Sequence, residues 1–108
     1  MRVIINQEKG DTFMIRVIAT FQLQNDMIDV AKRIAAALVS ETRNEDGCIQ
    51  YDLLQDDKDE HHLVIVEHWE SQEKLDAHSN SEHFVKYVPM LAELCRKAPE
   101  VVTYKSLF

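Results

Sequence analysis

The chain has 108 residues, 45% of them apolar, with only two glycines and two prolines, a composition typical of one regular globular domain rather than a disordered segment. Nineteen acidic against twelve basic residues give a formal charge of −7, which repels polyanions and argues against nucleic-acid binding. No stretch approaches the roughly 20 apolar residues needed to cross a bilayer, so we expect no membrane span and a cytoplasmic location.

Residues 1–12 are interpreted as an N-terminal extension that precedes a domain spanning residues 13–108. The apolar run at residues 3–5 could add an edge strand, and a turn at residues 9–11 would lead into the domain. From Phe13 to Phe21 apolar and polar residues alternate, as a half-buried strand requires. This segment is the first predicted strand of the sheet.

A helix is predicted next. Asn25 and Asp26 are expected to cap it, and Gly47, in a left-handed conformation, is expected to close it. Its apolar positions fall at three- and four-residue spacing, and are Met27, Ala31, Ile34, Ala35 and Leu38.

Two strands joined by a hairpin-type turn are predicted over residues 48–55 and 62–69. The acidic run 56–60 between them cannot be buried, and it lacks the central glycine of an EF-hand loop, so a solvated turn is favoured over a calcium site. Within the first of these strands, Ile49, Tyr51 and Leu53 are expected to share one face.

The last third of the chain predicts two helices and a strand. Ser71 is expected to cap a helix that carries Leu75 and His78 on one face, and the chain re-caps near residues 80–81. An apolar stripe then continues through Phe84, Tyr87, Val88, Leu91, Leu94 and Cys95. Pro89 is expected to kink or restart this second helix, and residues 101–104 predict the final strand.

The resulting order of elements is β-α-β followed by β-α-α-β. This order predicts an α+β fold with a ferredoxin-like antiparallel sheet and helices on one face. The other sheet face would need cover, and a second subunit is the simplest way to supply it. We therefore expect a homodimer.

His78 is the main candidate for chemistry. It faces inward, and an imidazole with an ordinary pKa of about 6.5 suits a general base if a ligand reaches it, although a hydrogen-bonded structural histidine explains it too. Trp69 at a strand end could form the wall of a pocket or simply fill the core. Tyr51, Glu67 and Tyr87 are candidate polar neighbours, and Glu67 could either orient a histidine or form a structural salt bridge.

The five histidines do not suggest a metal site. Adjacent His61 and His62 point to opposite faces of a strand, and His78 and His83 are not spaced as an i, i+4 helix pair. A glycine-rich phosphate loop is also lacking. We therefore expect no metal and no bound cofactor.

Two motifs carry a resemblance to a known family. The segment ETRNEDGCIQYDLLQD matches a helix end and second strand at Gly47, Cys48 and Tyr51. The segment EHWESQEKLDAH, followed by SEHF, matches a signature at Glu67, Trp69, Leu75, His78, His83 and Phe84. From Met14 to about Tyr104 the chain thus resembles the antibiotic biosynthesis monooxygenase (ABM) domain family.

The resemblance implies a dimeric α+β barrel, and departures from the pattern narrow the activity. Haem-degrading relatives would carry Asn, Trp and an axial His where this chain has Thr20, His78 and Val88. Anthrone-oxidising members use an Asn where this chain has Ile65. What remains resembles the small quinol monooxygenases, in which the deprotonated substrate itself reduces dioxygen.

The sequence therefore predicts a cofactor-independent monooxygenase that oxidises a small quinol, anthrone or related phenolic, with dioxygen as co-substrate. His78 is the expected catalytic base. The expected contacts to a small aromatic or quinone-like substrate are Trp69, Tyr51, Glu67, His83, Phe84 and Tyr87. The alternatives are an isomerase or aldehyde-processing enzyme acting on a small carbonyl compound, or a non-catalytic dimer that binds a small molecule.

Overall fold

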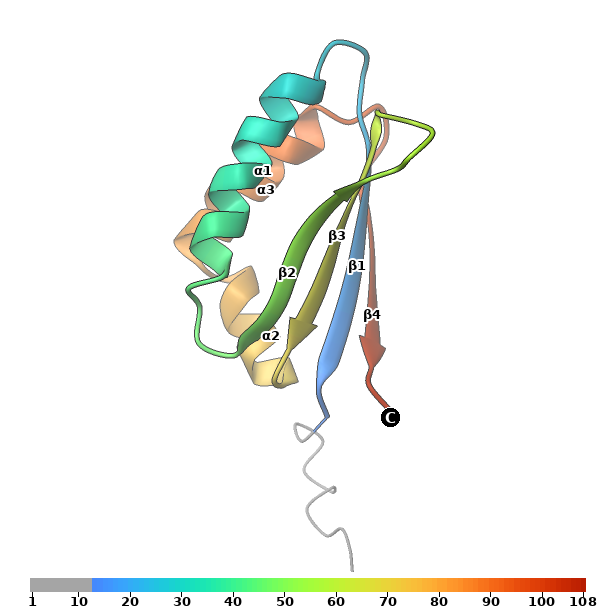
Figure 1. Ribbon diagram of the computed structural model, residues 1–108. Coiled ribbons are helices and arrows are strands. Elements are labelled where there is room, and N and C mark those ends of the chain that lie inside the picture. The colour runs from blue at the N-terminus through green and yellow to red at the C-terminus, as the bar shows by residue number, and fades with distance from the viewer. Residues whose placement is uncertain (1–12) are drawn as a thin grey trace, which may run out of the picture.

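The computed structural model describes residues 13–108, so the edge strand expected near the N-terminus lies outside the described residues. The elements are β1 (Ile15–Gln22), α1 (Ile28–Thr42), β2 (Cys48–Gln55), β3 (His62–Trp69), α2 (Gln72–Ser79), α3 (Glu82–Glu93) and β4 (Glu100–Lys105). The four strands form one antiparallel sheet in the order β2-β3-β1-β4. All three helices lie on one face of it (Figure 1). The predicted ferredoxin-like α+β fold is confirmed.

The central strand β1 shows the predicted alternation. Its inward side chains are buried, namely Ile15, Val17, Ala19 and Phe21. The register places Val17 opposite Glu67 of β3 and Thr103 of β4, and Ala19 opposite Ile65 and Val101. These inward positions of three neighbouring strands therefore form a continuous floor beneath the helices.

Helix α1 begins and ends differently from the prediction. It starts after Met27 with no side-chain cap, because Asp26, one residue too early to cap it, adopts a left-handed φ of 67°. It ends at Thr42, so Gly47 does not close it. Gly47 does have a positive φ of 89°, but it forms the turn that leads into β2.

A bulge at the start of β2 corrects the expected face of this strand. Cys48 pairs with Trp69 and Gln50 with the adjacent His68, so Ile49 is the extra residue and is 48% exposed. Tyr51 is restored to the inward face. Beyond the bulge, the Arg43 side chain donates from Nε to the backbone carbonyl of Tyr51 at 3.0 Å.

Serine caps divide the helical region after β3, as predicted. The Ser71 hydroxyl accepts from the backbone N–H of Lys74 at the start of α2. The Ser81 hydroxyl accepts from the N–H of Phe84 at the start of α3 and donates to the His78 carbonyl at 2.7 Å. The two helices are therefore separate, and the turn between them is held by the hydrogen bond from Ser81 to the His78 carbonyl.

Of the two outcomes expected at Pro89, a kink or a restart, the restart does not occur, because α3 runs through this residue as one helix. Proline removes one backbone donor, whose acceptor in a helix would be the carbonyl of Val85. Val85 is 62% exposed, so water can replace the missing bond. Among the described residues, none of the helices is long and apolar enough to cross a membrane.

Candidate active site

A cavity of about 160 Å³ lies between the inward sheet face and the helices α2 and α3. Its walls are mostly apolar, and the side chains that matter most for its chemistry and access are Tyr51, Glu67, His78, Phe84 and Val101. Val101 lies on β4 and is 63% exposed, so the cavity opens toward that strand. An apolar cavity of about 150 Å³ is known to hold one benzene molecule. This cavity can therefore receive a single aromatic ring.

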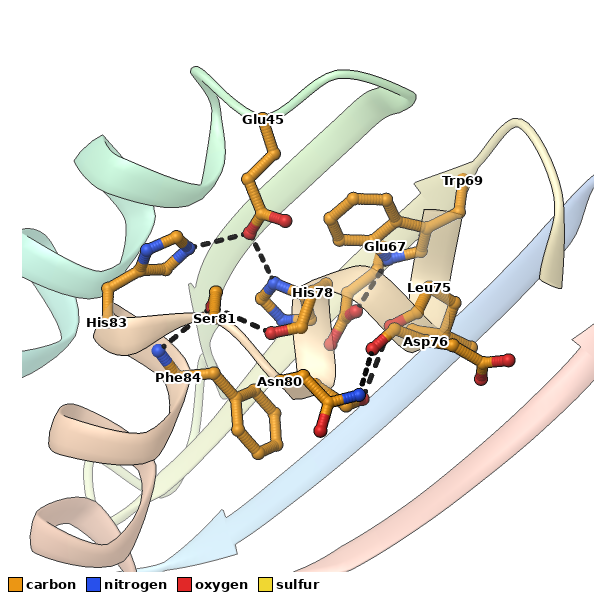
Figure 2. Close-up of polar contacts among 11 residues, drawn as sticks. Glu45, Glu67, Trp69, Leu75, Asp76, His78, Asn80, Ser81, His83 and Phe84 are labelled. Carbon is orange, nitrogen blue, oxygen red and sulfur yellow. Dashed lines mark hydrogen bonds and ion pairs between the residues drawn. The ribbon is translucent and has the colours of Figure 1, made fainter. Parts of the chain in front are cut away.

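His78, in the last turn of α2, is the most enclosed polar side chain of the cavity, with 1% of its surface exposed. Its ring lies 4.7 Å from the Trp69 ring and 5.1 Å from the Phe84 ring, measured between centroids. Tyr51 contacts it edge-on at 5.4 Å. Aromatic contacts on several sides therefore fix the orientation of the imidazole (Figure 2).

The partner of His78 is Glu45, a residue that the sequence did not single out. The Oε2 atom of Glu45 lies 2.6 Å from His78 Nδ1 and 2.6 Å from His83 Nε2, so one carboxylate bridges two imidazoles (Figure 2). Glu45 comes from the loop between α1 and β2, far from either histidine in the sequence. The one signal that pointed to it is its place in the acidic stretch just before Gly47 and Cys48.

This contact fixes which nitrogen of His78 is free. A carboxylate oxygen accepts, so Nδ1 carries the hydrogen and Nε2 keeps its lone pair. Nε2 is buried and has no hydrogen-bond partner. Burial lowers the pKa of His78, with the Glu45 carboxylate opposing part of that effect, so the neutral ring is favoured.

Glu67 is the second buried ionisable group at the cavity. Its Oε1 accepts a hydrogen bond of 2.9 Å from the indole N–H of Trp69, so its partner is not a histidine, contrary to the pairing considered from the sequence. Burial raises the pKa of Glu67 to about 7. Burial also raises the pKa of Tyr51, which therefore stays a neutral phenol.

The structure divides the predicted site residues into three groups. Tyr51, Glu67 and Phe84 line the cavity together with His78. Trp69 packs behind the imidazole instead of forming the cavity wall. His83 and Tyr87 lie on a separate surface groove, and His83 contacts the site through its hydrogen bond to Glu45 and through its ring, 6.0 Å from that of His78.

Within residues 13–108, one group of side chains could hold a metal ion. Its donor atoms come from Glu45, His78 and His83, and all lie within 4.8 Å of one another. The sequence did not predict this convergence. Spacing on one helix would separate the two histidines, but the break between α2 and α3 turns both toward the same carboxylate.

Comparison with known proteins places these features in context. The sequence model of a family described as "Antibiotic biosynthesis monooxygenase" matches residues 14–90. The Mycobacterium tuberculosis protein named "Putative monooxygenase Rv0793" is 35% identical over 92 residues, covering 85% of this chain and 89% of that protein.

Solved structures agree at the level of the fold. A crystal structure described as an antibiotic biosynthesis monooxygenase superposes with a TM-score of 0.83 at 34% identity, over 87% of this chain and 99% of that one. The structure of Rv0793 gives a TM-score of 0.83 at 30% identity, over 88% and 96% of the two chains. A conserved protein from Methanosarcina mazei gives 0.85 at 29% identity, over 93% and 99%.

Proposed function

Because this chain belongs to the antibiotic biosynthesis monooxygenase family, we propose that it oxidises a small single-ring hydroquinone or related phenolic with dioxygen, without a metal or flavin. His78 is the base that removes the first proton. Glu67, Tyr51 and Phe84 complete the pocket around the ring.

The observation that carries this proposal is the free Nε2 atom of His78. It is a buried lone pair without a partner, on a ring whose other nitrogen is committed to Glu45. Leaving a buried acceptor unpaired costs free energy, so such a group is explained best by a ligand that supplies the missing hydrogen. The hydroxyl of a phenolic substrate is such a ligand.

The chemistry balances without any further reactant. Deprotonation by Nε2 gives an electron-rich phenolate, which reduces dioxygen and forms a carbon–oxygen bond. Cleavage of the O–O bond then releases the second oxygen atom as water, so one hydroquinone and one dioxygen give one hydroxyquinone and one water. The pKa of Glu67, raised to about 7, lets this carboxyl group donate a proton to the departing oxygen at neutral pH.

The size of the cavity narrows the substrate class. About 160 Å³ accommodates one ring, whereas the three fused rings of an anthrone would extend past the exposed Val101 into solvent. Exclusion of water protects the reduced oxygen intermediates, and a ring that fits completely benefits most from this protection. We therefore expect single-ring hydroquinones to be oxidised faster than anthrones.

The test is dioxygen consumption by chelator-treated protein with a panel of hydroquinones and anthrones, comparing the wild type with His78→Asn. An asparagine amide N–H can replace Nδ1–H toward Glu45, so the variant removes Nε2 and keeps the contact that supports the loop. General-base assistance is worth roughly 100- to 10,000-fold, and we expect kcat/KM to fall by that order. His62→Asn, outside the cavity at the start of β3, is the matched control and should retain wild-type rates.

A second candidate function is an isomerase acting on a small carbonyl compound. It is favoured by the presence of a neutral imidazole, His78, and a protonated carboxyl group, Glu67, at one cavity. The same two groups would move a proton between carbon atoms without any oxidant. Oxygen dependence separates the two activities, because isomerisation continues under argon. Oxygen uptake that persists in His78→Asn would contradict the proposed role of this residue, and tight binding without turnover would indicate a binding protein.

A further inference from the structure

We infer that Glu45, His78 and His83 form a binding site for a divalent transition-metal ion such as Zn²⁺, and that the bound ion prevents His78 from acting as a base. Two imidazoles and one carboxylate are a donor set that such ions prefer. The three side chains come from a loop, from the end of α2 and from the start of α3, and all converge on Glu45 Oε2.

The three donor atoms need to move only slightly to bind a metal ion. Both imidazole nitrogens lie 2.6 Å from the same carboxylate oxygen, as hydrogen-bonded groups do. Ligand atoms about 2.0 to 2.2 Å from a tetrahedral Zn²⁺ are separated by about 3.3 Å, so each of these two contacts must lengthen by less than about 1 Å. The two imidazole nitrogens already lie within 4.8 Å of each other and must reach the same separation. Glu45 and His83 remain 15% and 16% exposed, which gives their side chains room for this adjustment.

The surface around His83 offers an entry path for a cation. His83 lines a groove together with Glu41, Glu82, Lys86 and Tyr87, so two carboxylates flank the approach against one ammonium group. An ion entering here reaches the cluster without crossing the apolar cavity on the other side of His78. An accessible path is one of the requirements for a functional metal site.

Metal binding and base function exclude each other through the tautomer of His78. A metal bound at Nδ1 needs the lone pair of that atom, and a neutral imidazole carries only one hydrogen, so the hydrogen must move to Nε2. Nε2 then carries the hydrogen as a donor and cannot accept a proton. This consequence for activity rests on the proposed function, whereas the binding site itself does not.

The binding test uses the full chain after removal of metals, titrated with Co²⁺ while its ligand-field absorption is recorded, followed by competition with Zn²⁺. We expect one ion per chain. Glu45→Gln and His83→Gln should each weaken binding by at least about 100-fold, since even the loss of an outer partner of a metal ligand costs roughly 10- to 100-fold. His62→Gln is the matched control, because His62 lies near Asp56 at a different place on the surface and should not contribute.

The change in Tm on adding Zn²⁺ compares metal binding among the variants separately from any loss of stability that the substitutions themselves cause. Zn²⁺ should raise the Tm of the wild type and of His62→Gln, but not of the other two variants, whose metal-free unfolding is measured beside them. Absence of a bound ion, or binding that survives both Glu45→Gln and His83→Gln, would overturn the site.

The tautomer switch is tested by ¹⁵N NMR of the His78 ring, which requires no turnover. The hydrogen should be on Nδ1 in the metal-free protein and on Nε2 with Zn²⁺ bound. A hydrogen that stays on Nδ1 in the Zn²⁺ form would refute the switch. If the protein consumes oxygen, Zn²⁺ should inhibit the wild type; if it does not, the binding and NMR results still decide the inference separately from the proposed function.

Discussion

His78 and Glu67 line the same cavity, and burial shifts their pKa values in opposite directions. The pKa of His78 is lowered and that of Glu67 is raised to about 7. Both shifts favour the uncharged form, so the imidazole can accept a proton while the carboxyl group can donate one. Groups whose environments shift them in this way commonly divide the base and acid roles of a reaction.

The raised pKa of Glu67 has a consequence for stability. Ionisation of this carboxyl group is costlier in the folded chain than in the unfolded chain, where its pKa is 4.5, so its contribution is fully present below pH 4.5 and is lost as pH rises through about 7. Glu67→Gln cannot ionise, and its amide oxygen can still accept from Trp69. We expect the variant to gain on the order of 2 to 3 kcal/mol relative to the wild type between pH 5 and pH 8.

The measurement is denaturant unfolding of both proteins at the two pH values. Comparison of variant with wild type at each pH separates Glu67 from His78, whose lowered pKa reduces stability as pH falls below 6.5 in both proteins. An equal stability difference at pH 5 and pH 8 would show that Glu67 titrates normally.

At this scale the sequence predicted part of the site. Inward spacing and motif agree in predicting His78, Tyr51, Glu67 and Phe84, and these residues do meet at the cavity. Glu45 was missed because it lies in a loop, where no periodicity indicates the direction of a side chain. Its role depends on a contact across 33 residues of sequence.

Among the elements, the turn before β2 controls where Glu45 lies. Gly47 has a φ of 89°, and its carbonyl accepts from the N–H of Glu70 at 2.9 Å. Lys74 of α2 lies across the glycine, and its ammonium group contacts Asp46 at 2.6 Å. The turn is thereby attached to both β3 and α2, the elements that carry Trp69 and His78.

Gly47→Ala should disrupt this attachment. An added Cβ would lie 2.3 Å from Lys74 Cγ, and a left-handed conformation costs a non-glycine residue about 1 to 3 kcal/mol. We expect a loss of stability of that size in thermal or denaturant unfolding. The double variant Gly47→Ala/Lys74→Ala should recover the part of the loss that comes from Lys74 Cγ and Cδ. It should not recover the part due to φ or to Lys74 Cβ, which would still lie 2.7 Å from the added Cβ. No recovery would show that the overlap with Cγ and Cδ is relieved without cost.

The bounds of some helices and strands can be predicted from local sequence patterns alone. The bounds predicted for the two hairpin strands agree with β2 and β3, because both have clear turn signals on each side. The bulge that exposes Ile49 could not be predicted, since it depends on pairing with β3 and not on the composition of β2. The capping of α1 failed for a similar reason, because the backbone at Asp26 is set by the tertiary turn.

At the scale of the whole molecule, the sheet face opposite the helices carries exposed apolar side chains in neighbouring register. Ile18 lies opposite Val66 on β3 and Val102 on β4, and Tyr104 lies opposite Arg16. Ile18, Val102 and Tyr104 are 38%, 46% and 48% exposed. Contiguous patches of this kind mark interaction surfaces, and we propose that a second copy of the chain covers this one.

Ile18→Asp should therefore convert a dimer into a monomer. The substitution places a charge at the centre of the patch, where burial would be costly. Light scattering coupled to size-exclusion chromatography measures the change, and Val85→Asp, an exposed position on α3 away from this sheet face, is the control that should remain dimeric (Figure 1). A wild type that is monomeric at micromolar concentration, or an Ile18→Asp variant that stays dimeric, would rule out this interface.

The contact between Arg43 and the Tyr51 carbonyl affects whether these sheets can polymerise. Fibre growth needs two receptive edges on every chain, one to accept a strand and one to offer a strand. Among the described strands, β2 and β4 are the edges; β2 is kinked by its bulge and has a carbonyl already occupied by Arg43, whereas β4 joins β1 without any shift in register. Pairing of two chains through β4 would thus leave a β2 edge on each side, bent by its bulge and with one carbonyl occupied, so further edge-to-edge addition of native chains is disfavoured.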